Sequence, residues 1–277
     1  MDWNGLFGLI YGLLGGFFEF LPVSPQVHQT VFLKLAGLES PGYGLSFAVH
    51  IGALAAVILT YYGRLSKLMR EQKILTQPKR RRKRQPDFIS LMELRLLKTA
   101  AVPVILSCLL TPWLSRYMSR LWVMTLLVIL NGIFVMLPQY MARANKDSRS
   151  MSPLDASLIG AGGILAAMPG ISRIGVLTSV ASMRGVDRQF GLDFACLLSV
   201  PALIALCVGD LAMMVIGRNS QAGALFIPGM LACIASFGAA MAAIRLMRFL
   251  SVKNGYESLA YYNWGLAMFA FVIYLIG

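Results

Sequence analysis

Long apolar segments alternate with short polar connections along most of this chain. A helix needs about 20 apolar residues to cross roughly 30 Å of hydrocarbon. Six segments approach or exceed this length, and we predict that each of them is a membrane-spanning helix. They are residues 45–62, 99–114, 121–140, 194–216, 222–246 and 258–276. Only 13% of the 277 residues are charged, whereas soluble domains average about 25%. The pattern therefore predicts an all-α polytopic membrane protein.

Two further apolar segments are interrupted by glycine and proline in the same way. Residues 15–25 read GGFFEFLPVSP and residues 162–172 read GGILAAMPGIS, so two glycines precede a proline at the same spacing in both. This match predicts an internal duplication, with a first repeat at 1–140 and a second at 155–277 within a single membrane domain. Interrupted helices in paired repeats point to a binding site inside the membrane.

The basic residues predict the orientation of the chain. Part of the net charge of +13 lies in KRRRKR at 79–84, inside the connection 63–94 between two spans. Membrane proteins keep basic connections in the cytoplasm. The run has no interleaved aromatic residues, so we expect a membrane surface and no nucleic acid as its partner. Alternation then gives equivalent spans opposite directions, which is typical of an inverted-topology repeat. Each glycine-rich segment is accordingly predicted to form a re-entrant helical hairpin.

The two hairpins carry charged residues that lipid would reject. We expect Glu19 to be the only carboxylate deep in the membrane domain, where an ionisable group is functional by default. The alternative is a protonated Glu19 in a structural hydrogen bond. Arg173 keeps its charge and follows a Pro-Gly pair, a setting that suits an anion such as phosphate. A purely structural ion pair between Glu19 and Arg173 is the second alternative.

The remaining candidates are polar residues near the two breaks. His28 can act as base, acid or nucleophile near neutral pH, or it can be a hydrogen-bonded core residue. His50 is interpreted as a packing residue. Ser24, Ser172 and Thr178 either donate hydrogen bonds to phosphate oxygens or cap the helices that restart after the breaks. Together these groups predict an amphiphilic substrate with a phosphorylated head and a lipid tail.

At these two segments the chain resembles the bacterial undecaprenyl-diphosphate phosphatase family, also known for bacitracin resistance. The family's first motif has two glutamates four residues apart, then Phe-Leu-Pro-[Ile/Val]-Ser-Ser and a histidine, and EFLPVS at 19–24 with His28 matches its second half. The second motif has Pro-Gly-x-Ser-Arg-Ser-Gly, and PGISRIG at 169–175 matches it except at one serine. Thr178 lies where a nearby threonine of the family is expected. Weaker similarity extends over nearly the whole chain.

The resemblance implies both an architecture and an activity. It implies six spans plus two re-entrant hairpins in an inverted repeat, in the bacterial cytoplasmic membrane, with a site that faces outward. The implied reaction removes the terminal phosphate from undecaprenyl diphosphate and recycles the carrier lipid for cell-envelope synthesis, with Mg²⁺ or Ca²⁺ as cofactor. Glu19 would bind the metal or activate the site. Arg173 would hold the diphosphate, and His28 with a serine would serve proton transfer or attack.

Four positions depart from the family pattern. The family's first glutamate falls on Gly15, its second serine on Pro25, a glutamine on Gly163 and the serine after arginine on Ile174. Because these positions differ, two other functions stay open. One is a non-hydrolytic polyprenyl-phosphate binding protein or flippase, and the other is a transporter of small ions or drugs. The sequence also leaves open whether the protein forms a homodimer.

Overall fold

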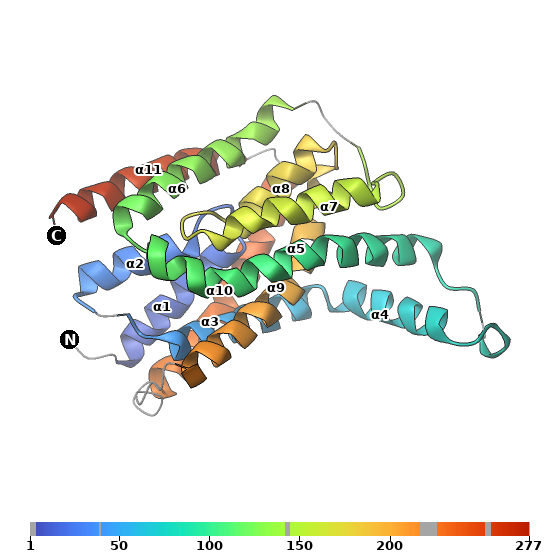
Figure 1. Ribbon diagram of the computed structural model, residues 1–277, viewed down its shortest axis with the longest axis horizontal. Coiled ribbons are helices and arrows are strands. Elements are labelled where there is room, and N and C mark those ends of the chain that lie inside the picture. Colours follow the sequence, from blue (N-terminus) through green and yellow to red (C-terminus); the bar gives the residue numbers. More distant parts are fainter. Residues whose placement is uncertain are drawn as a thin grey trace.

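The computed structural model describes residues 4–38, 40–82, 84–141, 145–216, 226–252 and 256–276. These residues form a bundle of helices with a narrower extension at one end (Figure 1). Six of the described helices are long and apolar enough to cross a membrane. They are α3 (Tyr43–Thr60), α5 (Phe88–Met118), α6 (Leu121–Met136), α9 (Arg188–Ile216), α10 (Phe226–Val252) and α11 (Tyr256–Ile276).

The six predicted spans are confirmed, with corrections at their ends. Helices α5 and α9 begin in polar sequence, before the apolar segments at 99 and 194, because hydropathy marks the membrane-embedded part of a helix and not its full length. The short helix η2 (Leu137–Tyr140) completes the span that begins with α6. Residues 222–225 of the span predicted at 222–246 lie outside the described residues. The inverted-topology repeat, with its halves at 1–140 and 155–277, stays a prediction.

Two helical hairpins lie among the long helices. The first consists of α1 (Gly5–Glu19) and α2 (Pro25–Ala36), and the second of α7 (Pro153–Gly162), η3 (Gly163–Ala167) and α8 (Arg173–Met183). At 1.5 Å per residue, α1 is about 22 Å long and α8 about 16 Å, so both are too short to cross the hydrocarbon. Their re-entrant insertion stays a prediction.

Proline and glycine produce the turns of both hairpins. Pro25 occupies the first turn of α2, where its missing N–H costs no helical hydrogen bond. In the second turn Gly170 has a φ of +120°, which a side chain would disfavour. A Cβ atom there would also lie 2.6 Å from Leu127 of α6. The second turn therefore requires glycine both for its backbone conformation and for its packing against α6.

A row of glycines packs α1 closely against α10. A methyl group added at Gly8, Gly12 or Gly16 would overlap a backbone oxygen of α10. Small residues four apart allow this kind of close approach between membrane helices, where dispersion forces replace the hydrophobic effect as the main attraction. The row therefore holds the first hairpin against a membrane-spanning helix and fixes the position of Glu19 at its end.

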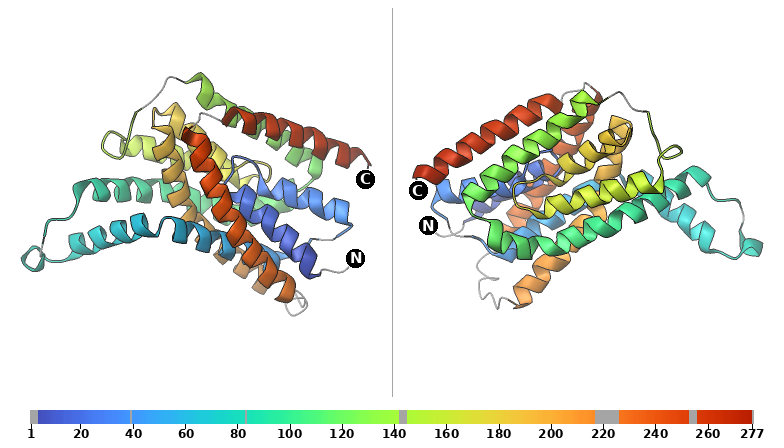
Figure 2. Two further views of the ribbon diagram at one scale, coloured as in Figure 1. Left: turned by 180° about the vertical axis from the view of Figure 1, so that it is seen from behind. Right: turned by 45° about the horizontal axis from the view of Figure 1, so that its top comes forward.

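The basic connection is a helical hairpin and not a loop. The sequence predicts a loop at 63–94, but α4 (Tyr62–Thr76) and the first turns of α5 occupy most of it and extend beyond the other helices (Figures 1 and 2). The Lys67 Nζ lies 2.9 Å from the Oδ2 of Asp87, the N-cap of α5, and the Arg84 Nη2 in the preceding segment lies 2.5 Å from the Glu71 Oε1. These ion pairs link α4 to the start of α5 and to the segment before it. Hydrogen bonding to Lys67 lowers the pKa of Asp87 to about 2. This carboxylate is therefore ionised at neutral pH.

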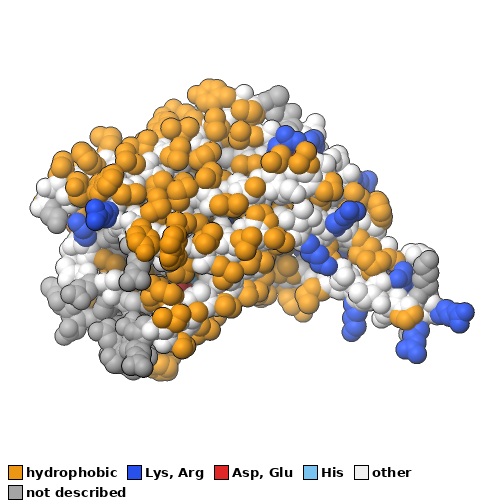
Figure 3. Space-filling view, viewed as in Figure 1, with side chains coloured by type: hydrophobic (Ala, Val, Ile, Leu, Met, Phe, Trp, Pro, Cys, Tyr) orange, Lys and Arg blue, Asp and Glu red, His pale blue; other side chains and the backbone are white. Residues whose placement is uncertain are grey.

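The surface separates apolar from basic regions. In Figure 3 hydrophobic side chains cover most of the broad part of the molecule, while most Lys and Arg side chains lie on the extension formed by α4 and α5 and on the part of the bundle next to it. Helix α1 begins and α11 ends at the opposite end of the bundle (Figure 1). The basic extension therefore lies at the end of the molecule away from the start of α1 and the end of α11.

Candidate functional site

The turns of the two hairpins meet in the interior. Glu19 ends α1 and Arg173 begins α8, and the Arg173 Nη2 donates a hydrogen bond to the Glu19 carboxylate. Only 11% of the Glu19 side chain and 8% of the Arg173 side chain are exposed. The Arg173 Nη1 lies 3.5 Å from the Sγ of Cys108 on α5. The structure thus brings together the two charged residues that the sequence places far apart.

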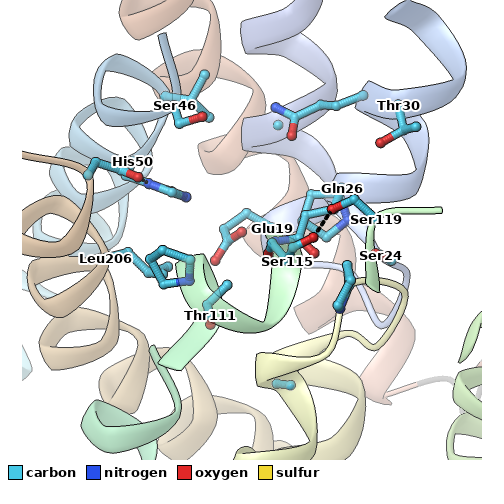
Figure 4. A pocket seen from close by; sticks show the side chains of 18 of the residues that line it. Glu19, Ser24, Gln26, Thr30, Ser46, His50, Thr111, Ser115, Ser119 and Leu206 are labelled. Carbon is cyan, nitrogen blue, oxygen red and sulfur yellow. Dashed lines mark hydrogen bonds and ion pairs between the residues drawn. The ribbon is translucent and has the colours of Figure 1, made fainter. Parts of the chain in front are cut away.

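A cavity of about 260 Å³ lies beside this ion pair (Figure 4). Helices α1, α2, α3, α5 and α9 surround it, together with the turn that precedes α8. It extends from Glu19 and Arg173 to the end of the bundle where α2 ends, α3 begins and α5 ends. Polar side chains line much of it: Ser24, Gln26, Gln29, Thr30, Ser40, Ser46, His50, Ser107, Thr111, Ser115, Ser119 and Asp210.

Two buried donor atoms in this cavity have no partner among the described residues. They are the hydroxyl of Ser24 and the Nε of Arg173. Ser24 precedes α2, yet its hydroxyl does not cap that helix. An unpaired buried donor costs about 1–3 kcal/mol, so native structures rarely keep one that no ligand or water completes. Both atoms are donors, and an acceptor such as a phosphate oxygen satisfies both.

Ser172 and Thr178 lie outside the cavity lining. The Ser172 hydroxyl accepts from the backbone N–H of Gly175 at 3.1 Å, as an N-cap, and donates to the Leu21 carbonyl at 2.7 Å. The Thr178 hydroxyl donates to the Ile174 carbonyl at 2.7 Å, one turn earlier in α8. For Ser172 the geometry therefore favours the capping alternative, and the Thr178 hydroxyl is engaged within its own helix.

His28 is held behind the first hairpin turn. Its ring stacks on Phe18 with 3.5 Å between the centroids. The His28 Nδ1 donates to the Ser24 carbonyl at 2.8 Å, so in the neutral ring Nε2 accepts from the Tyr262 hydroxyl at 2.9 Å. Both ring nitrogens have protein partners, and His28 is absent from the cavity lining.

Two buried asparagines complete the polar contacts behind the turns. Asn131 of α6 and Asn263 of α11 both donate to the Pro22 carbonyl at 3.0 Å, and they bond to each other at 2.8 Å. Asn131 also accepts from the Ser172 N–H at 2.8 Å. We call Asn131, Asn263, Ser172 and His28 the rear network. It joins both hairpin turns to the packed pair α6 and α11.

The cavity contains a titratable pair that the sequence did not predict, because His50 was interpreted as a packing residue and Asp210 was not singled out. The His50 Nδ1 lies 2.7 Å from the Asp210 Oδ2, and both side chains line the cavity. Asp210 is buried, so the expectation that Glu19 is the only deep carboxylate is wrong. Asp210 matches no motif and lies alone among apolar residues. A carboxylate within the predicted span 194–216 was the available signal.

The described residues do not supply a metal site by themselves. No group of three His, Cys, Asp or Glu side chains is close enough to hold an ion in the described part of the chain. Glu19 already pairs with Arg173, which competes for its oxygens. A Cβ atom at Gly15 would lie 2.5 Å from Val49 and 2.6 Å from Gln29. These two side chains therefore fill the space next to Gly15, where the family pattern has its first glutamate.

The fold and the cavity together define a class: a multi-span membrane protein with a buried polar pocket suited to an anionic ligand. A family model described as bacitracin resistance protein BacA matches residues 8–269. The chain therefore belongs to this family, which confirms the resemblance seen in the sequence.

Curated relatives cover nearly the same length. Undecaprenyl-diphosphatase of Neisseria gonorrhoeae is 27% identical, across 97% of this chain and 95% of the relative. The enzyme of the same name from Carboxydothermus hydrogenoformans is 27% identical across 99% of both chains. That of Nocardioides sp. is 27% identical across 89% of this chain and 88% of the relative. The similarity is thus low in identity but complete in extent.

Proposed function

We propose that this protein is an integral membrane undecaprenyl-diphosphatase. The reaction adds water to undecaprenyl diphosphate and releases inorganic phosphate and undecaprenyl phosphate, which recycles the carrier lipid for cell-envelope synthesis. Family membership and the names of the curated relatives support this proposal. The cytoplasmic membrane of a bacterium is the location that fits the family.

One observation carries the proposal: two unpartnered buried donors, from different hairpins, line one cavity. We assign Arg173 to the diphosphate oxygens, where a guanidinium stabilises the negative charge that develops as phosphorus is attacked. We assign the Ser24 hydroxyl to the terminal phosphate as a hydrogen-bond donor; attack by Ser24 itself stays a prediction from the sequence. Glu19 holds the Arg173 guanidinium and thereby aims its remaining N–H groups.

His28 is assigned a positioning role in this scheme. It holds the Ser24 carbonyl through Nδ1, and so it supports the backbone from which the Ser24 hydroxyl projects. The catalytic role predicted for His28 and the phosphate contacts predicted for Ser172 and Thr178 remain untested predictions.

The need for Mg²⁺ or Ca²⁺, with Glu19 as ligand, also stays a prediction. With one carboxylate at the junction, a divalent cation would need substrate phosphate oxygens as its other ligands. Phosphate release in the presence of EDTA, compared with added Mg²⁺ or Ca²⁺, measures this requirement. Full activity in EDTA would contradict it.

We further propose that the cavity faces the outer side of the membrane. It extends to the end of the bundle opposite the basic hairpin of α4 and α5, and basic segments stay in the cytoplasm. Single cysteines replacing Lys34 on α2 and Arg80 in the hairpin test this in intact cells. A membrane-impermeant maleimide should label only the Lys34 position, and labelling of the Arg80 position alone would reverse the assignment.

Phosphate release by the purified protein tests the proposed function. Wild type with undecaprenyl diphosphate should release phosphate, and Arg173→Ala should not. Ser199→Ala is a matched control, because this buried hydroxyl bonds within its own helix, to the Ala195 carbonyl. Wild-type release no greater than that of Arg173→Ala rejects the proposal. Transfer of the lipid head group across the proteoliposome membrane, without release of phosphate, would then identify a flippase.

A further inference from the structure

The His50–Asp210 pair lies in the same cavity as the junction of the hairpins. His50 is on α3 and Asp210 is on α9, two helices that pack against each other. Figure 4 shows the His50 side chain pointing into the space that Glu19 also enters. The Asp210 side chain is 7% exposed and the His50 side chain 20%. His50 is therefore the member of the pair that meets a ligand in the cavity.

The contact with Asp210 decides which ring nitrogen is basic. The carboxylate accepts, so His50 Nδ1 carries the proton, at 2.7 Å from the Asp210 Oδ2. In the neutral ring Nε2 then keeps its lone pair. Among the described residues no protein group bonds to that nitrogen. An imidazole oriented in this way by a carboxylate can take a proton, and the carboxylate stabilises the imidazolium that forms.

The charged groups that face His50 come from three helices. Burial disfavours the protonated ring and so does Arg173 of α8, whereas the hydrogen bond and charge of Asp210 of α9 and the charge of Glu19 of α1 favour it. Phosphate oxygens of a substrate in the cavity add further negative charge. The surroundings of His50 therefore support the positive charge that proton uptake creates.

The other helices packed against α3 add no charge near His50. Helix α10 presents the backbone of Cys233 and the hydroxyl of Ser236, which donates to the Val49 carbonyl at 2.8 Å. Arg64 of α4 lies beyond the other end of α3, where Glu93 and Asp193 hold it. Within the described part of the chain, the charged residues that act on His50 are therefore Asp210, Glu19 and Arg173.

We propose that His50, oriented by Asp210, is the general base of the phosphatase reaction, an assignment that rests on the proposed function. His50 Nε2 accepts a proton from the attacking water as the water oxygen bonds to the terminal phosphorus. The bond from that phosphorus to the bridging oxygen breaks, and its electron pair leaves on undecaprenyl phosphate. The proton on His50 returns to the released phosphate or to solvent. Asp210 is a positioning residue in this step.

The rate of phosphate release against pH tests the proposal in His50→Gln and Asp210→Asn. Removing a general base lowers kcat by about 10²- to 10⁴-fold and leaves KM nearly unchanged. Wild-type kcat/KM should rise with pH as His50 loses its proton, and His50→Gln should lose that rise. Asp210→Asn should give a smaller fall in kcat. His50→Ala should regain part of its activity with added imidazole, which a purely structural histidine would not show.

The controls separate this assignment from the proposed function. Ser199→Ala should behave as wild type, and size-exclusion profiles show whether the variants fold. If His50→Gln does not fold, the rate of phosphate release against pH in Asp210→Asn alone tests whether His50 is the general base. An active wild type with unchanged kcat and pH profile in the folded variants overturns the base assignment only. A raised KM at unchanged kcat also overturns it and makes His50 a binding residue. Absence of wild-type activity overturns both proposals.

Discussion

The cavity and the rear network lie on two sides of the same pair of hairpin turns, and both are rich in polar side chains. In the rear network Asn131, Asn263, Ser172 and His28 bond to backbone groups, to Tyr262 or to one another. On the cavity side, by contrast, the Ser24 hydroxyl and the Arg173 Nε have no partner among the described residues. Polarity alone therefore does not distinguish the two sides; the cavity side differs in having two buried donors, one from each hairpin, without a partner among the described residues.

The comparison also separates two kinds of effect that a substitution can have. A side chain in the rear network holds the turns in place, so its loss should appear first in stability. A side chain whose hydrogen-bonding partner is a ligand contributes little to the stability of the ligand-free protein and can even lower it. Its loss should appear in catalysis with little loss of stability.

The largest effect is expected from Arg173→Ala. This change removes a charged donor from the proposed phosphate site, so kcat/KM for phosphate release should fall by about 10³-fold or more. Arg173→Lys should recover only part of the activity, since an ammonium cannot form the paired hydrogen bonds of a guanidinium. Equal activity of wild type and Arg173→Ala would remove Arg173 from the site.

Of the two unpartnered donors, Ser24→Ala should have the smaller effect. It removes one unpartnered hydroxyl, and we expect phosphate release to fall by about 10²-fold with an unchanged melting temperature. Ser199→Ala is the matched change in a hydroxyl that already has a partner. A loss of stability in Ser24→Ala without a loss of activity would place Ser24 with the rear network.

Asn131→Ala should lower the stability of the protein more than its activity. It leaves the Ser172 N–H without its acceptor and takes one donor from the Pro22 carbonyl, at a cost of about 1–3 kcal/mol. The melting temperature in detergent should fall, while the rate per folded molecule should change less than in Ser24→Ala. A full loss of activity in a variant as stable as wild type would contradict this division.

A smaller loss of stability is expected from Gly15→Ala, at a position beside the cavity. The added methyl group meets Val49 and the Gln29 amide at 2.5 and 2.6 Å, so these side chains must shift. Gly238→Ala on α10 is the control, since the space next to Gly238 is open within 4 Å. Thermal denaturation should show a lower melting temperature for the first variant only. Equal melting temperatures would show that Gln29 moves aside at little cost.

The smallest effect is expected from Thr178→Val. The Thr178 hydroxyl bonds within α8, so kcat/KM should stay within about twofold of wild type. Phosphate release and KM measure this directly. A rise in KM of tenfold or more would restore the sequence-based prediction that Thr178 contacts phosphate.

Much of the architecture was predictable because hydrophobicity along the chain is a local property. The length of an apolar segment decides whether it can span hydrocarbon, and Pro22, Pro25 and Pro169 mark where helices must break. The same local reasoning missed α4, because an exposed helix with many charges leaves no mark in hydropathy. It also missed Asp210, one acidic residue within a long apolar segment.

The sequence by itself determined the six spans, the two segments in which glycine and proline interrupt a helix, and Arg173 as an anion-binding candidate. Each of these depends on residue type and spacing. Only the tertiary structure decided which polar residues share the cavity. His28 and His50 have the same chemistry, yet the first is stacked on Phe18 and bonded at both nitrogens, while the second lies beside Asp210 in the cavity. The distinction depends in part on residues far away in the chain, since Tyr262 is 234 residues from His28 and Asp210 is 160 residues from His50. No local sequence pattern predicts such long-range contacts.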